Sequence, residues 1–241
     1  MYDQFSRIYD ELVFDIDYER YSRHILTALE EEDYLGGSLL ELGCGTGRLT
    51  EKLAGRATSV FAVDLSDRML SLAWERLEGR DNVTFSCQDM TRLRAPQSDA
   101  CISLLDTFNY VDGAGLEKTL DRLSVVLKPG AALAFDLNSS FRLLEEIGDR
   151  TWIYEKDDIF YSWESRREEN RVESWLTFFL KQDSGFYDRI DEHQVQYYHD
   201  PEMVVDLLAA RGFEHIRIRD LDRMDTPHDR SRRILISARK R

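Results

Sequence analysis

The 241-residue sequence predicts an α/β protein in which a doubly wound, three-layer parallel sheet carries an inserted antiparallel lobe. Three observations lead to this fold class. Short apolar runs alternate with helical patterns over roughly 38–140. Aromatic and charged residues alternate between 152 and 198, which is typical of antiparallel strands with one wet face. A capped helix and two alternating strands then complete the chain.

Five buried strands are expected in the first half, each a short apolar run: 38–42, 58–65, 82–90, 99–106 and 131–140. Helical patterns separate them. After the first strand, Leu49 and Leu53 lie four positions apart. After the second, Ser66 can cap a helix whose apolar stripe begins at Met69. A leucine stripe over 115–127 and the turn LKPG precede the fifth strand. Strands that are apolar throughout belong in a parallel sheet covered on both faces.

The pattern changes after about residue 148. Between Trp152 and Tyr198 lie 12 of the 27 aromatic residues, in stretches such as RVESWLTFFLK that alternate with charged side chains. We therefore expect three or four antiparallel strands here, forming an inserted lobe at 149–198.

The end of the chain returns to the first pattern. Asp200-Pro201 is a typical helix start, and Gly212 ends that helix. Alternating strands follow at 215–221 and 232–240. We divide the chain into three parts: an N-terminal helical segment (1–35), a main domain (36–148 and 199–241) and the lobe (149–198).

Composition excludes several classes of protein. The net charge of −14 disfavours a protein that binds nucleic acid or an anionic membrane, because phosphate binding needs a basic surface. The three cysteines show no metal-ligand spacing, so we expect no metal. No apolar run is long enough to span a membrane, and the charged N-terminus does not resemble a signal peptide. We expect a cytoplasmic protein.

A glycine turn follows the first predicted strand. In ELGCGTG (41–47), Gly43, Gly45 and Gly47 let the backbone bend sharply and approach a ligand. Such turns hold nucleoside phosphates, nicotinamide dinucleotides or sulfonium cofactors. Asp64, at the end of the next strand, can accept hydrogen bonds from ribose hydroxyls, which dinucleotide enzymes also require. Asp89-Met90, after the third strand, offers a carboxylate and an apolar wall for adenine, which dinucleotide enzymes do not require.

Taken in order, these motifs resemble those of class I, Rossmann-like S-adenosylmethionine-dependent methyltransferases. ELGCGTG, VDLS (63–66), QDM (88–90), LLDTFNYV (104–111) and LKPGAALAFDL (127–137) match across roughly 36–140. The resemblance implies a seven-stranded sheet with an antiparallel last strand, the cofactor S-adenosylmethionine and the product S-adenosylhomocysteine. It also implies cofactor contacts at the following residues: Glu41, Gly43, Cys44, Gly45, Gly47, Asp64, Leu65, Met69, Asp89, Met90, Leu105 and Asp106.

The whole chain is similar to small stand-alone bacterial methyltransferases with a β-rich insertion after the fifth strand. These carry an N-terminal F-x-x-x-YD-x-L segment, here residues 5–12. The resemblance implies that residues 1–35 form a helical cap over the cofactor and that Tyr9 contacts its methionine carboxylate. Packing of an amphipathic helix explains Tyr9 equally well.

Catalytic residues are harder to assign, because methyl transfer mainly requires alignment of the acceptor. Asn109 and Tyr110 follow the fourth strand and are candidates to orient an acceptor, since the chain lacks an Asn-Pro-Pro-Tyr run. In the lobe, Arg189 and His193 share one strand face. Arg189 is a candidate to bind an anionic group of the acceptor, and His193 is a candidate base. The alternative is that both residues only belong to the solvent-exposed face of an antiparallel sheet. Cys44 has no activating neighbour in the sequence and is expected to be only a small residue that fits.

The sequence thus predicts a methyltransferase that acts on a small-molecule acceptor, at a nitrogen or an oxygen atom. The lobe then forms part of the acceptor pocket or a homodimer contact. Two alternatives remain open at this point: a tRNA-modifying methyltransferase, and a non-catalytic cofactor-binding or assembly protein.

Overall fold

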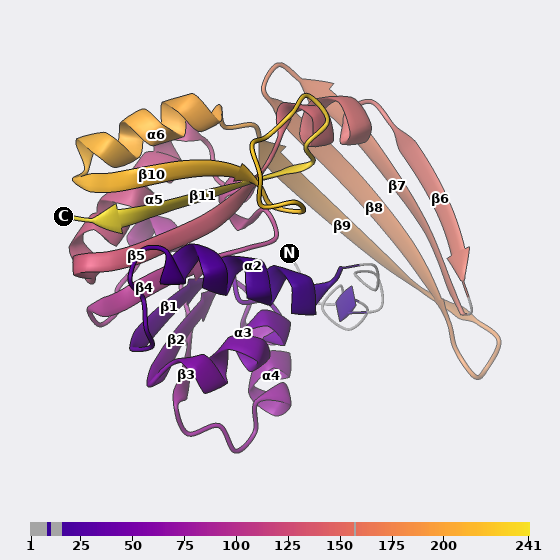
Figure 1. Cartoon of the computed structure of the whole chain (residues 1–241). Coiled ribbons are helices and arrows are strands. Elements are labelled where there is room, and N and C mark those ends of the chain that lie inside the picture. The colour runs from indigo at the N-terminus through magenta and orange to yellow at the C-terminus, as the bar shows by residue number, and fades with distance from the viewer. Residues whose placement is uncertain (1–8, 11–15, 157) are drawn as a thin grey trace.

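The computed structural model describes residues 9–10, 16–156 and 158–241, and these residues form two sheets (Figure 1). The larger one, here called the main sheet, has seven strands in the order β10 (Phe213–Asp220), β11 (Arg233–Lys240), β5 (Leu127–Asn138), β4 (Ser98–Ser103), β1 (Ser38–Leu42), β2 (Ser59–Asp64) and β3 (Val83–Cys87). The smaller one, the lobe, has the order β6 (Thr151–Lys156), β7 (Ile159–Glu168), β8 (Arg171–Lys181) and β9 (Tyr187–Tyr197).

Helices connect the strands. The α-helices are α2 (Tyr18–Glu30), α3 (Arg48–Leu53), α4 (Asp67–Arg76), α5 (Gly113–Val126) and α6 (Pro201–Ala210). Shorter helical turns are η1 (Ala54–Arg56), η2 (Met90–Arg92), η3 (Thr107–Tyr110) and the π-helical η4 (Phe141–Ile147). As the sequence predicts, Ser66 caps α4 by accepting a bond from the Met69 amide, and Asp200 caps α6 with Pro201 in its first turn.

The strand directions confirm the predicted fold class. The neighbours β3, β2, β1, β4 and β5 pair in parallel, whereas β11 runs antiparallel to both β5 and β10. The carboxyl ends of the parallel strands therefore lie along one edge of the main sheet, where ligands bind in doubly wound folds.

Several strand boundaries differ from the sequence prediction, and two of these differences fall on predicted motifs. β3 ends at Cys87, and Asp89 instead caps η2 by accepting a bond from the Thr91 amide. β5 begins at Leu127, so the expected LKPG turn lies inside the strand. A bulge accommodates it, because the pairing with β4 shifts register at this point and Gly130 adopts a φ of +82°.

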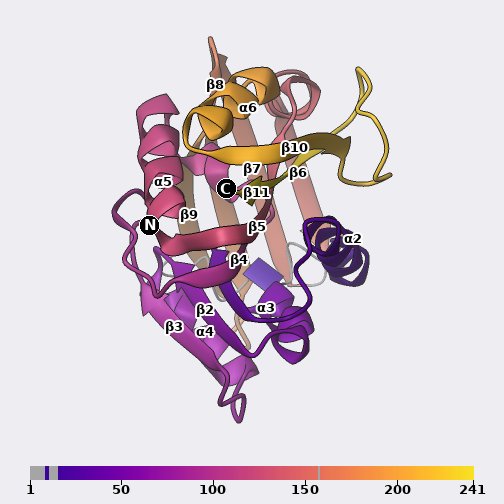
Figure 2. The ribbon, with the colours of Figure 1, turned by 60° about the vertical axis from the view of Figure 1, so that its left-hand side comes forward.

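Side chains on the two faces of the main sheet form separate cores. Along β5, Ala132 and Ala134 face α2 and α3, whereas Leu133 and Phe135 face α5 and α6. The small alanines let α2 lie close to the sheet, and the large residues fill the space under the opposite layer. Figure 2 shows α5 and α2 on opposite sides of the sheet.

The lobe packs on the main domain through one of its faces. Val172 contacts Leu143 and Ile147 of η4, and Phe178 and Ile190 contact Met69 of α4. The opposite face, here called the outer face, carries the exposed side chains of Ile153 and Trp175.

The N-terminal segment is only partly described. The helix expected within 1–35 corresponds to α2, and residues 1–8 and 11–15 lie outside the described residues. No helix among the described residues has the length and apolar character needed to cross a bilayer.

Candidate active site

A pocket of about 360 Å³ lies at the carboxyl edge of the main sheet, between the ends of β1, β2 and β4 and the lobe strand β9. Most of the predicted site residues line it: Tyr9, Glu41, Gly43, Cys44, Gly45, Asp64, Leu65, Met69, Asp89, Met90, Leu105, Tyr110 and His193. The other predicted residues, Gly47, Asp106, Asn109 and Arg189, are not part of its lining.

The glycine turn closes one end of the pocket. Gly43, Gly45 and Gly47 all have positive φ, between +53° and +77°. A Cβ atom at Gly43 would lie 2.3 Å from Oγ1 of Thr107, and one at Gly47 would lie 2.8 Å from Leu77. A Cβ at Gly45 would meet nothing within 4 Å, because this residue faces open space. Gly43 and Gly47 therefore allow close packing, and Gly45 is the glycine that leaves room for a ligand.

Asp64 fixes the shape of this turn. Its Oδ2 accepts a hydrogen bond from the Gly45 amide at 2.8 Å, and its Oδ1 accepts one from the Ser66 amide at 2.9 Å. Burial raises the pKa of Asp64, and the backbone hydrogen bonds from Ser66 and Gly45 oppose that rise. The carboxylate thus joins the ends of β1 and β2, a role that the sequence did not indicate.

Glu41 brings a second carboxyl group to the same end. Its side chain is 2 % exposed, and burial, reinforced by the charge of Asp64, raises its pKa to about 8. Oε2 of Glu41 is buried without a hydrogen-bond partner among the described residues. A cationic ligand group would pair with the ionised form of this buried carboxyl and reduce the free-energy cost of its charge.

Cys44, inside the turn, has the inert character expected of it. The residue is 6 % exposed, and burial raises the pKa of its thiol well above the ordinary range. A thiol held in its protonated form is a poor nucleophile.

The middle of the pocket is apolar. Leu65, at the end of β2, keeps 67 % of its surface exposed although it lines the pocket, while Met69 beside it is buried. Met90 and Asp89 lie on the adjoining side, after β3. An exposed leucine at the edge of a concave site is covered when a flat apolar ligand group binds.

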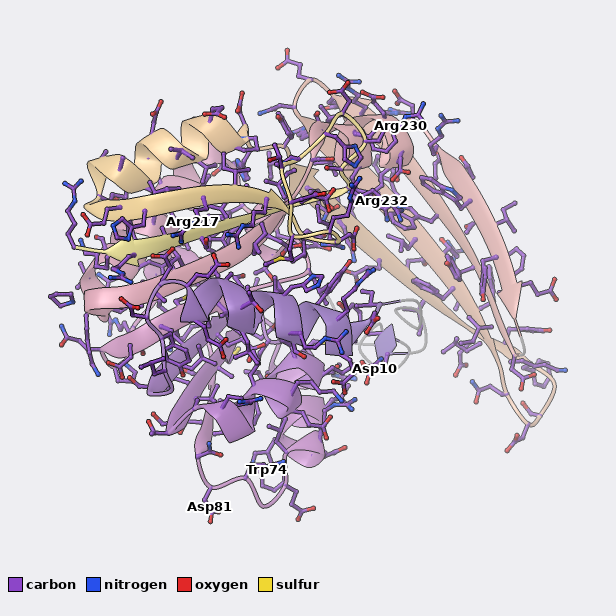
Figure 3. All side chains as sticks on the ribbon, viewed as in Figure 1. Asp10, Trp74, Asp81, Arg217, Arg230 and Arg232 are labelled. Atoms are coloured by element: carbon purple, nitrogen blue, oxygen red, sulfur yellow. The ribbon has the colours of Figure 1, made fainter. Side chains whose placement is uncertain are left out.

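Two residues of the N-terminal segment reach this site. Tyr9 lines the pocket, and the carboxylate of Asp10 accepts a hydrogen bond from Thr46 Oγ1 at 2.6 Å and forms an ion pair with Arg76. Arg48 donates to the Asp10 carbonyl at 3.3 Å. Figure 3 shows Asp10 between the main domain and the lobe. The N-terminal segment is therefore tied directly to the glycine turn at Thr46.

The lobe closes the other side of the pocket through β9. His193 lines the pocket, stacks on Trp175 with ring centroids 5.3 Å apart, and has Nε2 3.5 Å from Oε2 of Glu173. Arg189 lies on the same strand face but outside the pocket, where it pairs with Asp191 at 2.8 Å. His193 therefore borders the pocket from the outer face of the lobe, and Arg189 lies farther along that face, outside the pocket.

Asn109 and Tyr110 also differ in whether they line the pocket. Asn109 is fully buried: its Nδ2 donates to the Tyr197 carbonyl at 2.8 Å, and its Oδ1 accepts from the Asn138 amide at 2.9 Å. It joins the main sheet to β9 and is not part of the pocket lining. Tyr110 does line the pocket, and its hydroxyl donates to Oε1 of Gln194 at 3.2 Å.

A buried ionic network lies behind the pocket. Arg233 of β11 bonds to Asp106 at 2.6 Å and to Asp136 at 2.7 Å, and Gln196 of β9 donates to the other oxygen of Asp106. Burial raises the pKa of Asp136 to about 6, and the Arg233 charge opposes this. Asp106 and Leu105 both have positive φ, a strained geometry that the network holds in place.

Sequence reasoning missed several residues that line the pocket. They come from α2, the glycine turn, the start of α3, η3 and β9, and include Tyr18, Thr46, Arg48, Thr107, Gln194 and Tyr197. Among the described residues, no three His, Cys, Asp or Glu side chains gather closely enough to hold a metal ion.

Comparison with known proteins adds independent information. A family model described as "Methyltransferase domain" matches residues 39–130. The "Putative methyltransferase YqeM" of Bacillus subtilis (strain 168) is 32% identical to this chain over 246 residues, covering 100% of this chain and 97% of the relative.

Solved structures agree with the sequence matches. The crystal structure of an S-adenosylmethionine-dependent methyltransferase from Clostridium acetobutylicum ATCC 824 superposes with a TM-score of 0.90 at 31% identity, covering 99% of this chain and 98% of the other. The sugar N-methyltransferase KedS8 from Streptoalloteichus sp. ATCC 53650 has a TM-score of 0.81 at 20% identity, covering 100% and 93%, and shares the fold.

Proposed function

This chain belongs to the class I S-adenosylmethionine-dependent methyltransferases, and on that premise we propose that it methylates a small-molecule acceptor bound between η3 and β9. The observation that carries the proposal is the concave pocket, whose two ends differ in chemistry. The glycine-turn end presents buried carboxyl groups, and the β9 end presents Tyr110, His193 and Gln194.

The residues at the glycine turn fit the amino-acid part of the cofactor. S-adenosylmethionine carries an ammonium and a carboxylate on this part, and its sulfonium already activates the methyl group for transfer. Glu41 would pair its unpartnered Oε2 with the ammonium. Gly45 would leave room for the chain, and Tyr9 is our candidate for the carboxylate.

The middle of the pocket fits the adenosine part. Asp64 lies at the end of β2, where its carboxylate would accept from the ribose hydroxyls while its backbone bonds hold it in place. Leu65 and Met90 would cover the two sides of the adenine ring. Oδ1 of Asp89 accepts from the Thr91 amide, and Oδ2 would accept from the adenine amino group.

The β9 end would hold the acceptor and remove its proton where one must leave. We propose His193 as that base, because Glu173 lies 3.5 Å from its Nε2 and Trp175 fixes the plane of its ring. Tyr110, held by Gln194, would position the acceptor. Arg189 and Asn109 are left out of this assignment, because neither lines the pocket.

The charge of the chain supports a small acceptor over RNA. A net charge of −14 repels a polyanion, and the pocket of about 360 Å³ is concave. A tRNA substrate would need a basic surface that leads to the pocket.

Transfer of a radiolabelled methyl group into a fractionated bacterial extract tests the proposal. The purified chain and labelled S-adenosylmethionine are incubated with separate small-molecule, RNA and protein fractions. We expect label in the small-molecule fraction, absent when Asp64→Ala replaces the wild-type chain. Label in the RNA fraction alone would favour the tRNA alternative, and label in protein alone would place the acceptor on a macromolecule.

A further inference from the structure

A second cleft of about 660 Å³ lies where the lobe joins the main domain, and we call it the junction cleft. It is lined by η4, by Arg150 in the connection from η4 to β6, by β6 and β7, and by one residue of the β10–β11 connection. The residues proposed to contact a ligand are Arg142, Arg150, Trp152, Tyr154 and Arg232. None of the residues that line it also lines the cofactor pocket. In Figure 1, the helix at 141–147 and the β10–β11 connection lie together at the upper end of the lobe.

One wall of the junction cleft is aromatic. Trp152 pairs with Trp163 across β6 and β7, with ring centroids 5.1 Å apart, and Tyr154 pairs with Tyr161 at 5.2 Å. These residues alternate along their strands, so they share one face of the lobe. Trp152 remains 37 % exposed, which leaves part of its ring surface available to a flat ligand.

Three arginines also line the junction cleft. Arg142 and Arg232 share the single carboxylate of Glu146, at 3.2 and 2.8 Å. Arg150 has no ion pair among the described residues. Glu145 also lines the cleft but is exposed, so three guanidinium groups face two carboxylates. The cleft therefore carries a local positive charge in a chain whose net charge is −14.

The environment of Arg142 also indicates a local positive charge in the cleft. Burial, followed by the positive charge of Arg232, lowers the pKa of Arg142, and the hydrogen bond to Glu146 opposes that shift. An anion placed between Arg142 and Arg232 would reduce their mutual repulsion. Guanidinium groups bind carboxylates and phosphates through two parallel hydrogen bonds, which suits this pair.

We propose that the junction cleft is a second ligand site, which binds a small organic anion that carries an aromatic ring. The ring packs on Trp152 and Tyr154, and the carboxylate or phosphate bonds to Arg142, Arg150 and Arg232. The bound anion joins η4 to β6 and β7, across the segment that connects the lobe to β5.

Calorimetry and tryptophan fluorescence with simple probes test this proposal. The probes are 2-naphthoate and 2-naphthyl phosphate, which separate a carboxylate ligand from a phosphate ligand, with neutral 2-naphthol and inorganic phosphate as comparisons. We expect one naphthyl anion to bind and to quench tryptophan fluorescence, with an affinity that saturating S-adenosylhomocysteine leaves unchanged. The neutral probe and inorganic phosphate should each bind about tenfold more weakly or worse.

Matched variants complete the test. Arg232→Gln removes an exposed cleft arginine (52 % exposed side chain) and should weaken the binding affinity for the naphthyl anion by about tenfold. Arg230→Gln, two positions earlier in the same connection and outside the lining, should leave it unchanged (Figure 3). Equal binding by both variants, equal binding of 2-naphthol, or displacement by S-adenosylhomocysteine would each overturn the proposal. These measurements involve no methyl transfer, so they are independent of the proposed function.

Discussion

Glu41 is a carboxyl group buried where water does not solvate its charge. Its pKa of about 8 in the folded chain lies well above the value of about 4.3 expected in the unfolded chain. Between these values the folded chain keeps a proton that the unfolded chain releases, so the free energy of unfolding falls as pH rises through this window. Above about pH 8 both states are ionised, and the dependence ends. The residue thus lowers the stability of the ligand-free chain near neutral pH, while it prepares a site for a cation.

Replacing Glu41 with glutamine should separate these two effects. Because Glu41→Gln cannot ionise, the variant should match wild type near pH 4 and become more stable than wild type toward pH 8, by at most about 1.4 kcal/mol per pH unit. Its affinity for S-adenosylhomocysteine should fall. Urea denaturation at three pH values and calorimetry measure both. The control is Glu145→Gln, an exposed substitution outside the pocket, and parallel pH slopes for wild type and Glu41→Gln would contradict the assignment.

His193 is the proposed base, and its partner Glu173 makes that role testable. His193→Ala should leave S-adenosylhomocysteine affinity unchanged and slow turnover of the acceptor by roughly 100-fold or more, a typical loss for a general base. Glu173→Gln should give a smaller loss and alter the pH dependence of turnover. The control is Arg189→Gln, which lies four residues before His193 on the same face of β9 and outside the pocket. Normal turnover by His193→Ala would return this histidine to a purely structural role on the sheet.

Asp10 ties the N-terminal segment to the glycine turn through Thr46 and Arg76. We expect Asp10→Ala to speed the dissociation of S-adenosylhomocysteine by roughly five- to tenfold, because it loses hydrogen bonds to charged partners that are partly exposed to solvent. Stopped-flow displacement measures this rate. Asp81→Ala, exposed and remote from the pocket, should change nothing (Figure 3). An unchanged rate in Asp10→Ala would mean that the contact does not restrain the cofactor.

At the scale of elements, η3 is the connection between the two sheets. Through Asn109 it bonds the backbone of β5 on one side and of β9 on the other, and through Tyr110 it bonds Gln194. The lobe strand β9 is therefore positioned by polar bonds from Asn109 and to Asp106 as well as by apolar packing. A small displacement of β9 would move His193 together with it.

Asn109→Ala should therefore loosen β9 specifically. The buried amide of Asn138 loses its acceptor, which costs roughly 1–3 kcal/mol of unfolding free energy. Hydrogen exchange read by mass spectrometry should show faster exchange in β9 and η3, with β1 and β2 unchanged. Asn170→Ala, in the exposed turn between β7 and β8, is the control. Uniform loss of protection across both sheets would instead point to global destabilisation.

Sequence reasoning found the elements and most of the residues that line the glycine-turn end of the pocket, and the reason is local. Each buried strand is an apolar run, and Glu41, Gly45 and Asp64 stand at strand ends that a parallel sheet brings together. It did not find the pairing of Arg233 with Asp136 and Asp106, because contacts between residues so far apart in the chain leave no periodic signal. Strand alternation likewise placed Arg189 and His193 on one face, but it does not say which of them reaches the pocket.

For the whole molecule, the outer face of the lobe raises the question of self-association. Ile153 (70 % exposed) and Trp175 (40 %) lie on this face, and Phe160 and Phe179 pair beside them. Exposed apolar surface on a sheet is a common contact between copies of a chain. We keep the prediction of a homodimer formed through this face.

Light scattering coupled to size-exclusion chromatography tests that prediction. Wild type should elute as a dimer at micromolar concentration, and Trp175→Glu as a monomer, because the charged side chain would be buried without a partner. Trp74→Glu replaces a more exposed tryptophan, on α4, and should leave the dimer intact (Figure 3). A monomeric wild type would remove the outer face as an interface.

The position of Arg233 also has a consequence for biosynthesis. Its strand, β11, follows all the other strands of the main sheet in chain order, yet it lies between β5 and β10 and pairs with Asp106 and Asp136 behind the pocket. A nascent chain that ends before this strand has an incomplete sheet and two carboxylates without their counter-ion. The support behind the cofactor pocket is therefore complete only once β11 has been synthesised and has paired with β5.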